Sequence, residues 1–158
     1  MPVTVNIHHL ELKDVHLEGE LPAAELDLGN TDELIHARQP LLYDLTVQKV
    51  GTDLLAQGTL SLTVDCECAR CLRPFEYLIQ MDNWTAHFAL VGPEKGPIHD
   101  DLADLTPQIR EDILLEFPQH PLCGADCAGL PNRSKEKKKS AGQSDGSPAW
   151  AELNKLKF

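Results

Sequence analysis

The stretch that decides the fold runs from residue 41 to residue 90: LLYDLTVQKVGTDLLAQGTLSLTVDCECARCLRPFEYLIQMDNWTAHFAL. Apolar residues alternate with polar ones in three runs, at residues 41–47, 60–66 and 75–81. A period of two places each apolar set on one face of a β-strand. Gly51-Thr52-Asp53 predicts a turn between the first two runs. Successive strands with short connections are most simply antiparallel, so the pattern predicts a meander packed on one face.

The flanking segments give weaker signals. Residues 3–12 alternate and predict a strand with an irregularity at His8-His9. Residues 18–40 are acidic and are compatible with a short strand or a short helix. Residues 91–104 contain Gly, Pro and several acidic residues and predict a loop.

A helix is predicted directly after this loop. Thr106 is a capping residue type, and Pro107 fits the first helical position, where its missing N–H costs nothing. Pro118 should end the helix. The apolar stripe that would pack on the sheet consists of Ile109, Ile113 and Phe117, with Leu114 beside them.

The charge of the chain is unevenly distributed. The 158 residues carry a net charge of −11, but residues 1–130 hold 22 acidic and 7 basic residues, and residues 131–158 hold 3 acidic and 7 basic ones. An acidic body argues against non-specific nucleic-acid binding, because phosphate contacts need Lys and Arg. Weak RNA contact through charge is therefore expected only from the tail, at Lys135, Lys137, Lys138 and Lys139.

Composition predicts three regions within one α+β, mainly β chain. Residues 1–130 form a β-rich domain with one core helix, and residues 131–148 form a flexible basic linker without large apolar side chains. Residues 149–158 form a short C-terminal helix. Its side chains that recur at spacing three, and would dock on the body or on a partner, are Trp150, Leu153 and Leu156. The N-terminus lacks a secretory signal pattern and the chain lacks an apolar run long enough to span a bilayer, so a cytoplasmic location is expected.

Four of the five cysteines form two close pairs. Cys68 and Cys71 make a C-x-x-C in the turn between two predicted strands, and Cys123 and Cys127 make a C-x-x-x-C after the predicted helix. A reducing compartment favours metal ligands over disulfides. Two pairs of thiolates would complete a tetrahedral Zn²⁺ site without an open position, which would make the metal structural.

Two other interpretations of the thiols stay open. In the first interpretation the cysteines are reduced and packed without a ligand. It suits Cys66 best, because Cys66 continues the apolar alternation of its predicted strand. Alternatively the C-x-x-C is a redox pair, although thioredoxin-like chemistry needs that motif at a helix N-terminus and not between strands. The sequence lacks a Gly-rich phosphate loop and a G-x-S-x-G motif, so it offers no catalytic residues outside the thiols.

Three segments together resemble one known family: ECARCLRPF, DLTPQIREDILLEFPQHPLC followed by CAGL, and the terminal WAELNKLK. They are similar to the YceD family, the bacterial large ribosomal RNA subunit accumulation proteins, which also occur in plastids. The resemblance places the family's C-x-x-C on Cys68 and Cys71, its acidic helix on residues 110–113 and its downstream cysteines on Cys123 and Cys127. Many members continue with a further cysteine-rich stretch, which this chain lacks.

The resemblance implies a cytoplasmic, non-enzymatic factor in accumulation or processing of large-subunit ribosomal RNA. The acidic body predicts ribosomal proteins or other assembly factors as partners, because their basic surfaces complement it. Ribosomal RNA would be reached through the basic linker, and neither a membrane nor a small-molecule substrate is expected. Two hypotheses from other classes are a zinc-stapled protein–protein interaction module unrelated to ribosomes and a thiol oxidoreductase.

Overall fold

The computed structural model describes residues 2–28, 32–93 and 95–130. Its elements in chain order are β1 (Thr4–Asn6), α1 (Ile7–Leu10), β2 (Val15–Leu21), β3 (Ile35–His36), β4 (Leu41–Val50), β5 (Asp53–Glu67), β6 (Pro74–Ala89), β7 (Ile98–His99), β8 (Leu102–Asp104) and α2 (Thr106–Leu115). The prediction of an α+β, mainly β fold is confirmed.

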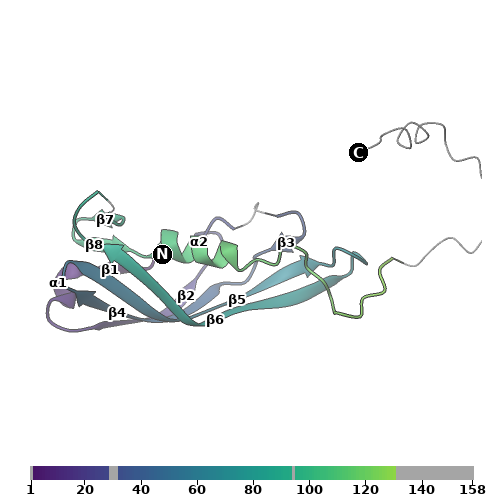
Figure 1. The fold of residues 1–158 in the computed structure, drawn as a ribbon, viewed down its shortest axis with the longest axis horizontal. Helices are drawn as coiled ribbons and strands as arrows, with labels where there is room; N and C mark the ends of the chain where they lie inside the picture. Colours follow the sequence, from purple (N-terminus) through teal and green to yellow (C-terminus); the bar gives the residue numbers. More distant parts are fainter. Residues whose placement is uncertain (1, 29–31, 94, 131–158) are drawn as a thin grey trace, which may run out of the picture.

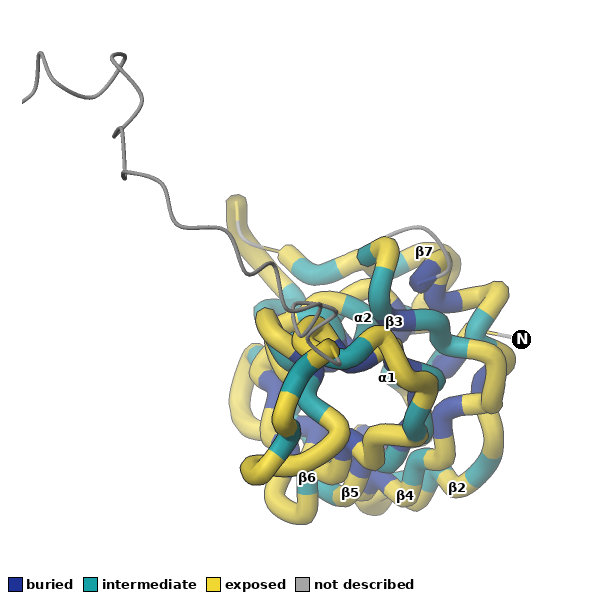
Figure 2. Tube along the Cα trace, turned by 90° about the vertical axis from the view of Figure 1, so that its right-hand side faces the viewer, coloured by how far each residue is buried: buried dark blue, intermediate teal, exposed yellow. Residues whose placement is uncertain are grey.

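A five-stranded antiparallel sheet forms one layer, built around β5 (Figure 1). Strand β6 pairs with β5 along nearly its whole length. On the other edge of β5, β4 pairs with residues 53–61 and β3 pairs with residues 65–66. Strand β2 then pairs with β4, so that β6, β5, β4 and β2 lie side by side in Figure 2, with α2 across from them.

The predicted meander is confirmed as β4, β5 and β6, and its strands extend beyond the alternating runs. The inward positions of β5 are even-numbered and, apart from the half-buried Gly58, are buried, as at Leu54, Leu60 and Val64. Strands β4 and β5 are joined by Gly51 and Thr52 alone, and Gly51 has a φ of +64°. A two-residue hairpin loop requires such a positive φ, which glycine adopts without steric cost.

A bulge in β6 changes which residues of that strand face the core. Gly58 pairs with Trp84 and Leu60 pairs with Met81, so two steps along β5 match three steps along β6. One extra residue reverses the alternation. Ile79 is therefore buried before the bulge, and the even-numbered Trp84 and Phe88 are buried after it.

Gly58 lets β4 approach β5 at this irregularity. A Cβ atom placed on Gly58 would collide with the carbonyl oxygen of Asp44 and would lie 2.8 Å from the Cα of Leu45. Both are backbone atoms of β4, which cannot move aside without breaking the ladder. The position therefore excludes every residue except glycine.

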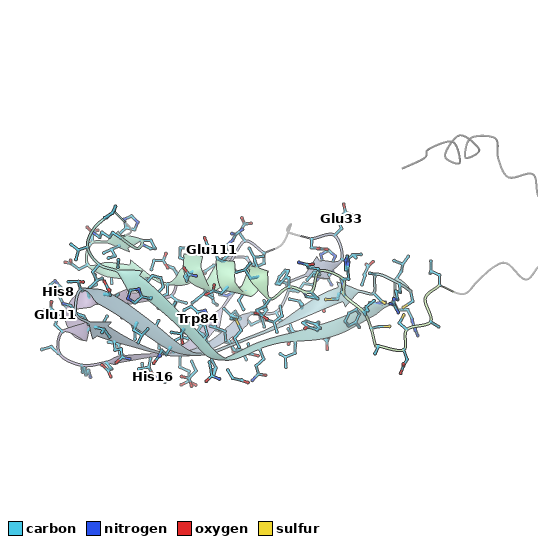
Figure 3. All side chains as sticks on the ribbon, viewed as in Figure 1. His8, Glu11, His16, Glu33, Trp84 and Glu111 are labelled. Carbon is cyan, nitrogen blue, oxygen red and sulfur yellow. The ribbon has the colours of Figure 1, made fainter. Side chains whose placement is uncertain are left out.

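Helix α2 lies over one face of the sheet and covers its core (Figure 1). Ile109 and Ile113 are fully buried, as predicted from their spacing. Trp84, which points toward α2 in Figure 3, donates from Nε1 to Asp112 Oδ2 at 2.7 Å. The helix ends at Leu115, so Phe117 is half-buried against the core from the segment that follows.

Two predictions were wrong in detail: the strand at residues 3–12 and the loop at residues 91–104. The first strand ends at Asn6, whose side-chain oxygen accepts from the N–H of His8 at 2.9 Å and caps the four-residue α1. Leu12 is consequently 86% exposed instead of belonging to a strand. The predicted loop at residues 91–104 contains β7 and β8, and β8 pairs with β1 to form a second, three-stranded sheet.

Thr106 was expected to cap the helix but has another partner. Its hydroxyl oxygen accepts from the N–H of Val3 at 2.9 Å, while its own N–H donates to Asp104 Oδ1 at 2.9 Å. Since Leu105 also donates its N–H to the carbonyl of Val3 at 2.8 Å, the start of α2 is fastened to the N-terminal segment. Such a pairing across about a hundred residues leaves no local signal.

Residues 131–158 lie outside the described residues. The predicted linker at 131–148 and the predicted helix at 149–158 therefore stay predictions. The predicted domain boundary at residue 130 also stays a prediction, because the described residues end there.

Replacing Gly58 by alanine should destabilise the fold strongly. The new Cβ would force β4 and β5 apart, and we expect the free energy of unfolding in urea to fall by about 2–4 kcal/mol. Gly124→Ala is the matched control, because a Cβ at Gly124 meets no atom within 4 Å. Equal stability of the two variants would contradict the close approach of β4 to β5.

Candidate metal centre

Two segments distant in sequence meet at the far end of the β5–β6 hairpin. The connection between β5 and β6, residues 68–73, carries the first cysteine pair, and the chain after α2 runs back to it and carries the second pair (Figure 1). Ala69 donates its N–H to the carbonyl of Pro121 at 2.8 Å and joins the two segments directly. Figure 3 shows sulfur atoms of both segments at this end of the hairpin.

The backbone of the first segment forms a tight turn around Cys68. The Cys68 N–H donates to the carbonyl of Arg73 at 2.9 Å, and the Cys68 carbonyl accepts from the N–H of Leu72 at 2.8 Å. Leu72 adopts a left-handed conformation with φ of +59°. Because the chain reverses within so few residues, the thiols of Cys68 and Cys71 end on the same side of the turn.

The four sulfur atoms converge on one point. Cys68 Sγ lies 3.7 Å from Cys127 Sγ, and Cys71 Sγ lies 3.7 Å from Cys123 Sγ. All four Sγ atoms lie within 4.8 Å of one another. The structure thus brings together all four cysteines that were predicted as metal ligands.

These distances suit a tetrahedral metal site. With Zn–S bonds of about 2.3 Å, the sulfurs of a tetrahedron are about 3.8 Å apart. A disulfide would need an S–S distance of about 2.05 Å. The spacing therefore matches four ligands around an ion better than it matches two disulfides.

Backbone and guanidinium donors favour thiolates in the cluster. The backbone N–H groups of Cys123 and Cys71 point to the Cys68 sulfur and lower the pKa of that thiol to about 5. The Nε–H of Arg73 donates to Cys71 Sγ at 3.3 Å and lowers the pKa of Cys71. Hydrogen bonds with the Cys71 and Cys127 sulfurs raise the pKa of Cys123 to about 12, so the cluster does not readily release all its protons without a cation.

Burial within the cluster is graded. Cys68 is fully buried, Cys71 and Cys127 are half-buried, and Cys123 is exposed. An ion held here would be bound at the surface end of the hairpin with four protein ligands and no position left for a substrate. This arrangement suits a structural role.

Cys66 is separate from the cluster, as predicted. Its side chain is 1% exposed and belongs to the hydrophobic core. Burial raises the pKa of its thiol, with a smaller contribution from the charge of Asp65. It packs as a small apolar residue.

The redox interpretation receives no support from the position of the motif. The C-x-x-C lies between β5 and β6, so no helix dipole acts on it from a following helix. The other predicted contact residues, for RNA and for docking, are outside the described residues: Lys135, Lys137, Lys138, Lys139, Trp150, Leu153 and Leu156. Sequence reasoning missed the role of Arg73, whose position two residues after Cys71 was the available signal.

The protein-family model described as "Large ribosomal RNA subunit accumulation protein YceD" matches residues 56–157 of this chain. The match includes most of β5, all of β6 and α2, and both cysteine pairs. The chain belongs to the YceD family. The name of the family describes a role in accumulation of the large ribosomal RNA subunit.

The chain is similar in sequence to several curated mycobacterial proteins. An uncharacterized protein of Mycobacterium tuberculosis and one of Mycobacterium bovis are each 32% identical in an alignment of 148 positions that covers 82% of this chain and 67% of the relative. An uncharacterized protein of Mycobacterium leprae is 31% identical in an alignment of 99 positions that covers 58% of this chain and 46% of that protein. No solved structure matches the chain. Among residues 2–28, 32–93 and 95–130, no helix is both long and apolar enough to cross a membrane.

Mild oxidation of chelator-treated protein should connect the two cysteine segments. Because their sulfurs are only 3.7 Å apart in two pairs, we expect disulfides that join residues 68–71 to residues 123–127. Mass spectrometry of peptides from the diamide-oxidised, non-reduced protein would identify them. Cys66 is the internal control and should stay unlinked, and cross-links through Cys66 alone would contradict the geometry.

Proposed function

We propose that this protein is a non-catalytic factor, acting in the cytoplasm, that supports assembly of the large ribosomal subunit and thereby the accumulation of its ribosomal RNA. The observation that carries the proposal is membership of the YceD family, through a match that spans residues 56–157. The function is needed during assembly, because RNA that is not packaged with its proteins is exposed to degradation. Binding alone can supply such protection, so the proposal requires no catalytic residue.

Charge determines the kind of partner that suits the folded part of the chain. Residues 1–130 are strongly acidic, and surfaces of ribosomal proteins and of many assembly factors are basic because they contact RNA. Opposite charge accelerates encounter and favours correct partners. We therefore propose ribosomal proteins or assembly factors as partners of the folded domain, with ribosomal RNA contacted weakly through Lys135, Lys137, Lys138 and Lys139.

We further propose that Cys68, Cys71, Cys123 and Cys127 hold one structural Zn²⁺. The sulfur spacing and the thiolate-favouring donors described above support this ligand set. An ion there would connect the β5–β6 turn to the segment that follows α2. A link between segments about fifty residues apart restricts the unfolded chain and so stabilises the folded one.

Deleting the gene should lower the amount of mature large-subunit ribosomal RNA. We expect a deficit of free large subunits in sucrose-gradient profiles and less mature large-subunit RNA relative to small-subunit RNA. Plasmid-borne wild-type protein is the control and should restore both. Normal RNA ratios and normal subunit profiles in the deletion strain would refute the proposed function.

Protein purified without chelator should contain about one zinc per chain by elemental analysis. Cys71→Ser removes one of four ligands, and we expect it to retain at least tenfold less zinc and to unfold at a lower temperature. Cys66→Ala is the matched control, because Cys66 lies in the core and outside the cluster, and it should keep one zinc. Fully folded protein without metal would refute the zinc site and would leave the ribosomal proposal standing.

The alternative function is a zinc-stapled interaction module unrelated to ribosomes. Affinity purification with identification of both RNA and protein separates it from the main proposal. Recovery of ribosomal proteins or assembly factors supports assembly of the large subunit. Recovery of a partner set that lacks them supports the alternative.

A further inference from the structure

One face of the five-stranded sheet is not covered by any other described element. We call it the outer sheet face: the even-numbered positions of β2 and β4, the odd-numbered positions of β5 and their cross-strand partners on β6. Figure 3 shows His16 of β2 on this side, opposite to Glu33 and Glu111, which lie on the side of α2. Since β5 alone has 15 residues at about 3.3 Å each, the face is about 50 Å long.

At the defined strand positions the charged groups other than histidine are all acidic, and Arg38, which lies outside these positions, is 3.6 Å from Asp65. Glu18 and Asp44 are directly paired across β2 and β4, and Glu20 follows two residues later on β2. The defined strand positions contain neither Lys nor Arg. On the opposite side of the sheet, in contrast, Arg110 of α2 donates to the carbonyl of Leu26 at 2.8 Å and lies 4.0 Å from Asp27.

The same face has an apolar centre within its acidic region. A hollow of about 410 Å³ lies over β2, β4 and β5, and its lining includes Leu42 together with Glu18, Glu20 and Asp44. Leu42 is 48% exposed, and Leu78 on β6 is 54% exposed. A Lys or Arg side chain fits such a surface, because its aliphatic stem covers the leucine while its charged end reaches the carboxylates.

We propose that the outer sheet face docks a basic segment of a large-subunit ribosomal protein. The proposal rests on the proposed function for the identity of the partner and on charge complementarity for the surface. RNA phosphate would be repelled by this face, whereas a Lys- and Arg-rich protein segment would be attracted. Docking would hold such a segment away from incorrect RNA contacts until its own site forms.

Two charge-reversal variants test the surface. The outer-face variant carries Glu18→Lys, Glu20→Lys and Asp44→Lys. The control carries Glu33→Lys, Glu111→Lys and Glu116→Lys, three exposed positions that lie away from this face. Both variants change the net charge equally, so a difference between them reports position and not total charge. Circular dichroism and thermal unfolding verify that both are folded.

Binding is measured with individually purified large-subunit ribosomal proteins and the full-length chain, by fluorescence anisotropy at low and high salt. We expect at least one basic ribosomal protein to bind, with an affinity that weakens as salt rises. The outer-face variant should bind it at least tenfold more weakly, and the control variant should stay within about threefold of wild type. The inference is overturned if no ribosomal protein binds, if both variants weaken binding equally, or if the face instead binds a ribosomal RNA fragment.

Complementation of the deletion strain separates the two proposals. The control variant should restore mature large-subunit RNA, and the outer-face variant should not. If the deletion has no effect on RNA, the proposed function fails, and the binding measurement still reports on the surface. If the deletion lowers the RNA and the outer-face variant restores it fully, the docking inference fails while the proposed function stands.

Discussion

The pairing of β5 with strands on both of its edges is the interaction on which the rest of the structure depends. Strand β6 occupies one edge, while β4 and β3 share the other. This arrangement works only because Gly58 admits the backbone of β4 at the point where β6 carries an extra residue. The bulge then turns Trp84 toward α2, so the position of the helix on the sheet follows from an irregularity in the central strand pair.

The same hairpin extends beyond the core and carries the cysteine cluster at its end. Its turn presents Cys68 and Cys71, and the chain after α2 returns to supply Cys123 and Cys127. A helix fixed at its start by Val3 and on its side by Trp84 directs that return. One long strand pair therefore carries the candidate metal centre at its end and the hydrophobic core along one face, with the outer sheet face on the opposite side.

The local sequence pattern was sufficient to predict an element where apolar residues repeat regularly or where a turn depends on neighbouring residues. The alternation at residues 41–47 and 60–66, the Gly51 turn and the spacing of Ile109 and Ile113 each indicated the correct element. Prediction failed where a distant group competes for a residue. Thr106 looks like a helix cap in isolation, but the N–H of Val3 takes its hydroxyl, and the apparently loop-like residues 102–104 become a strand only because β1 lies beside them.

The sequence by itself determined the strand-rich character of the chain, the division into an acidic body and a basic tail, and the spacing of the two cysteine pairs. These properties depend on residue type and short spacing, which are complete in the linear chain. Only the tertiary structure decided that the four sulfurs meet within 4.8 Å and that Glu18, Glu20 and Asp44 line one hollow. The physical reason is that strand register and the path after α2 depend on packing between distant segments, which no local pattern specifies.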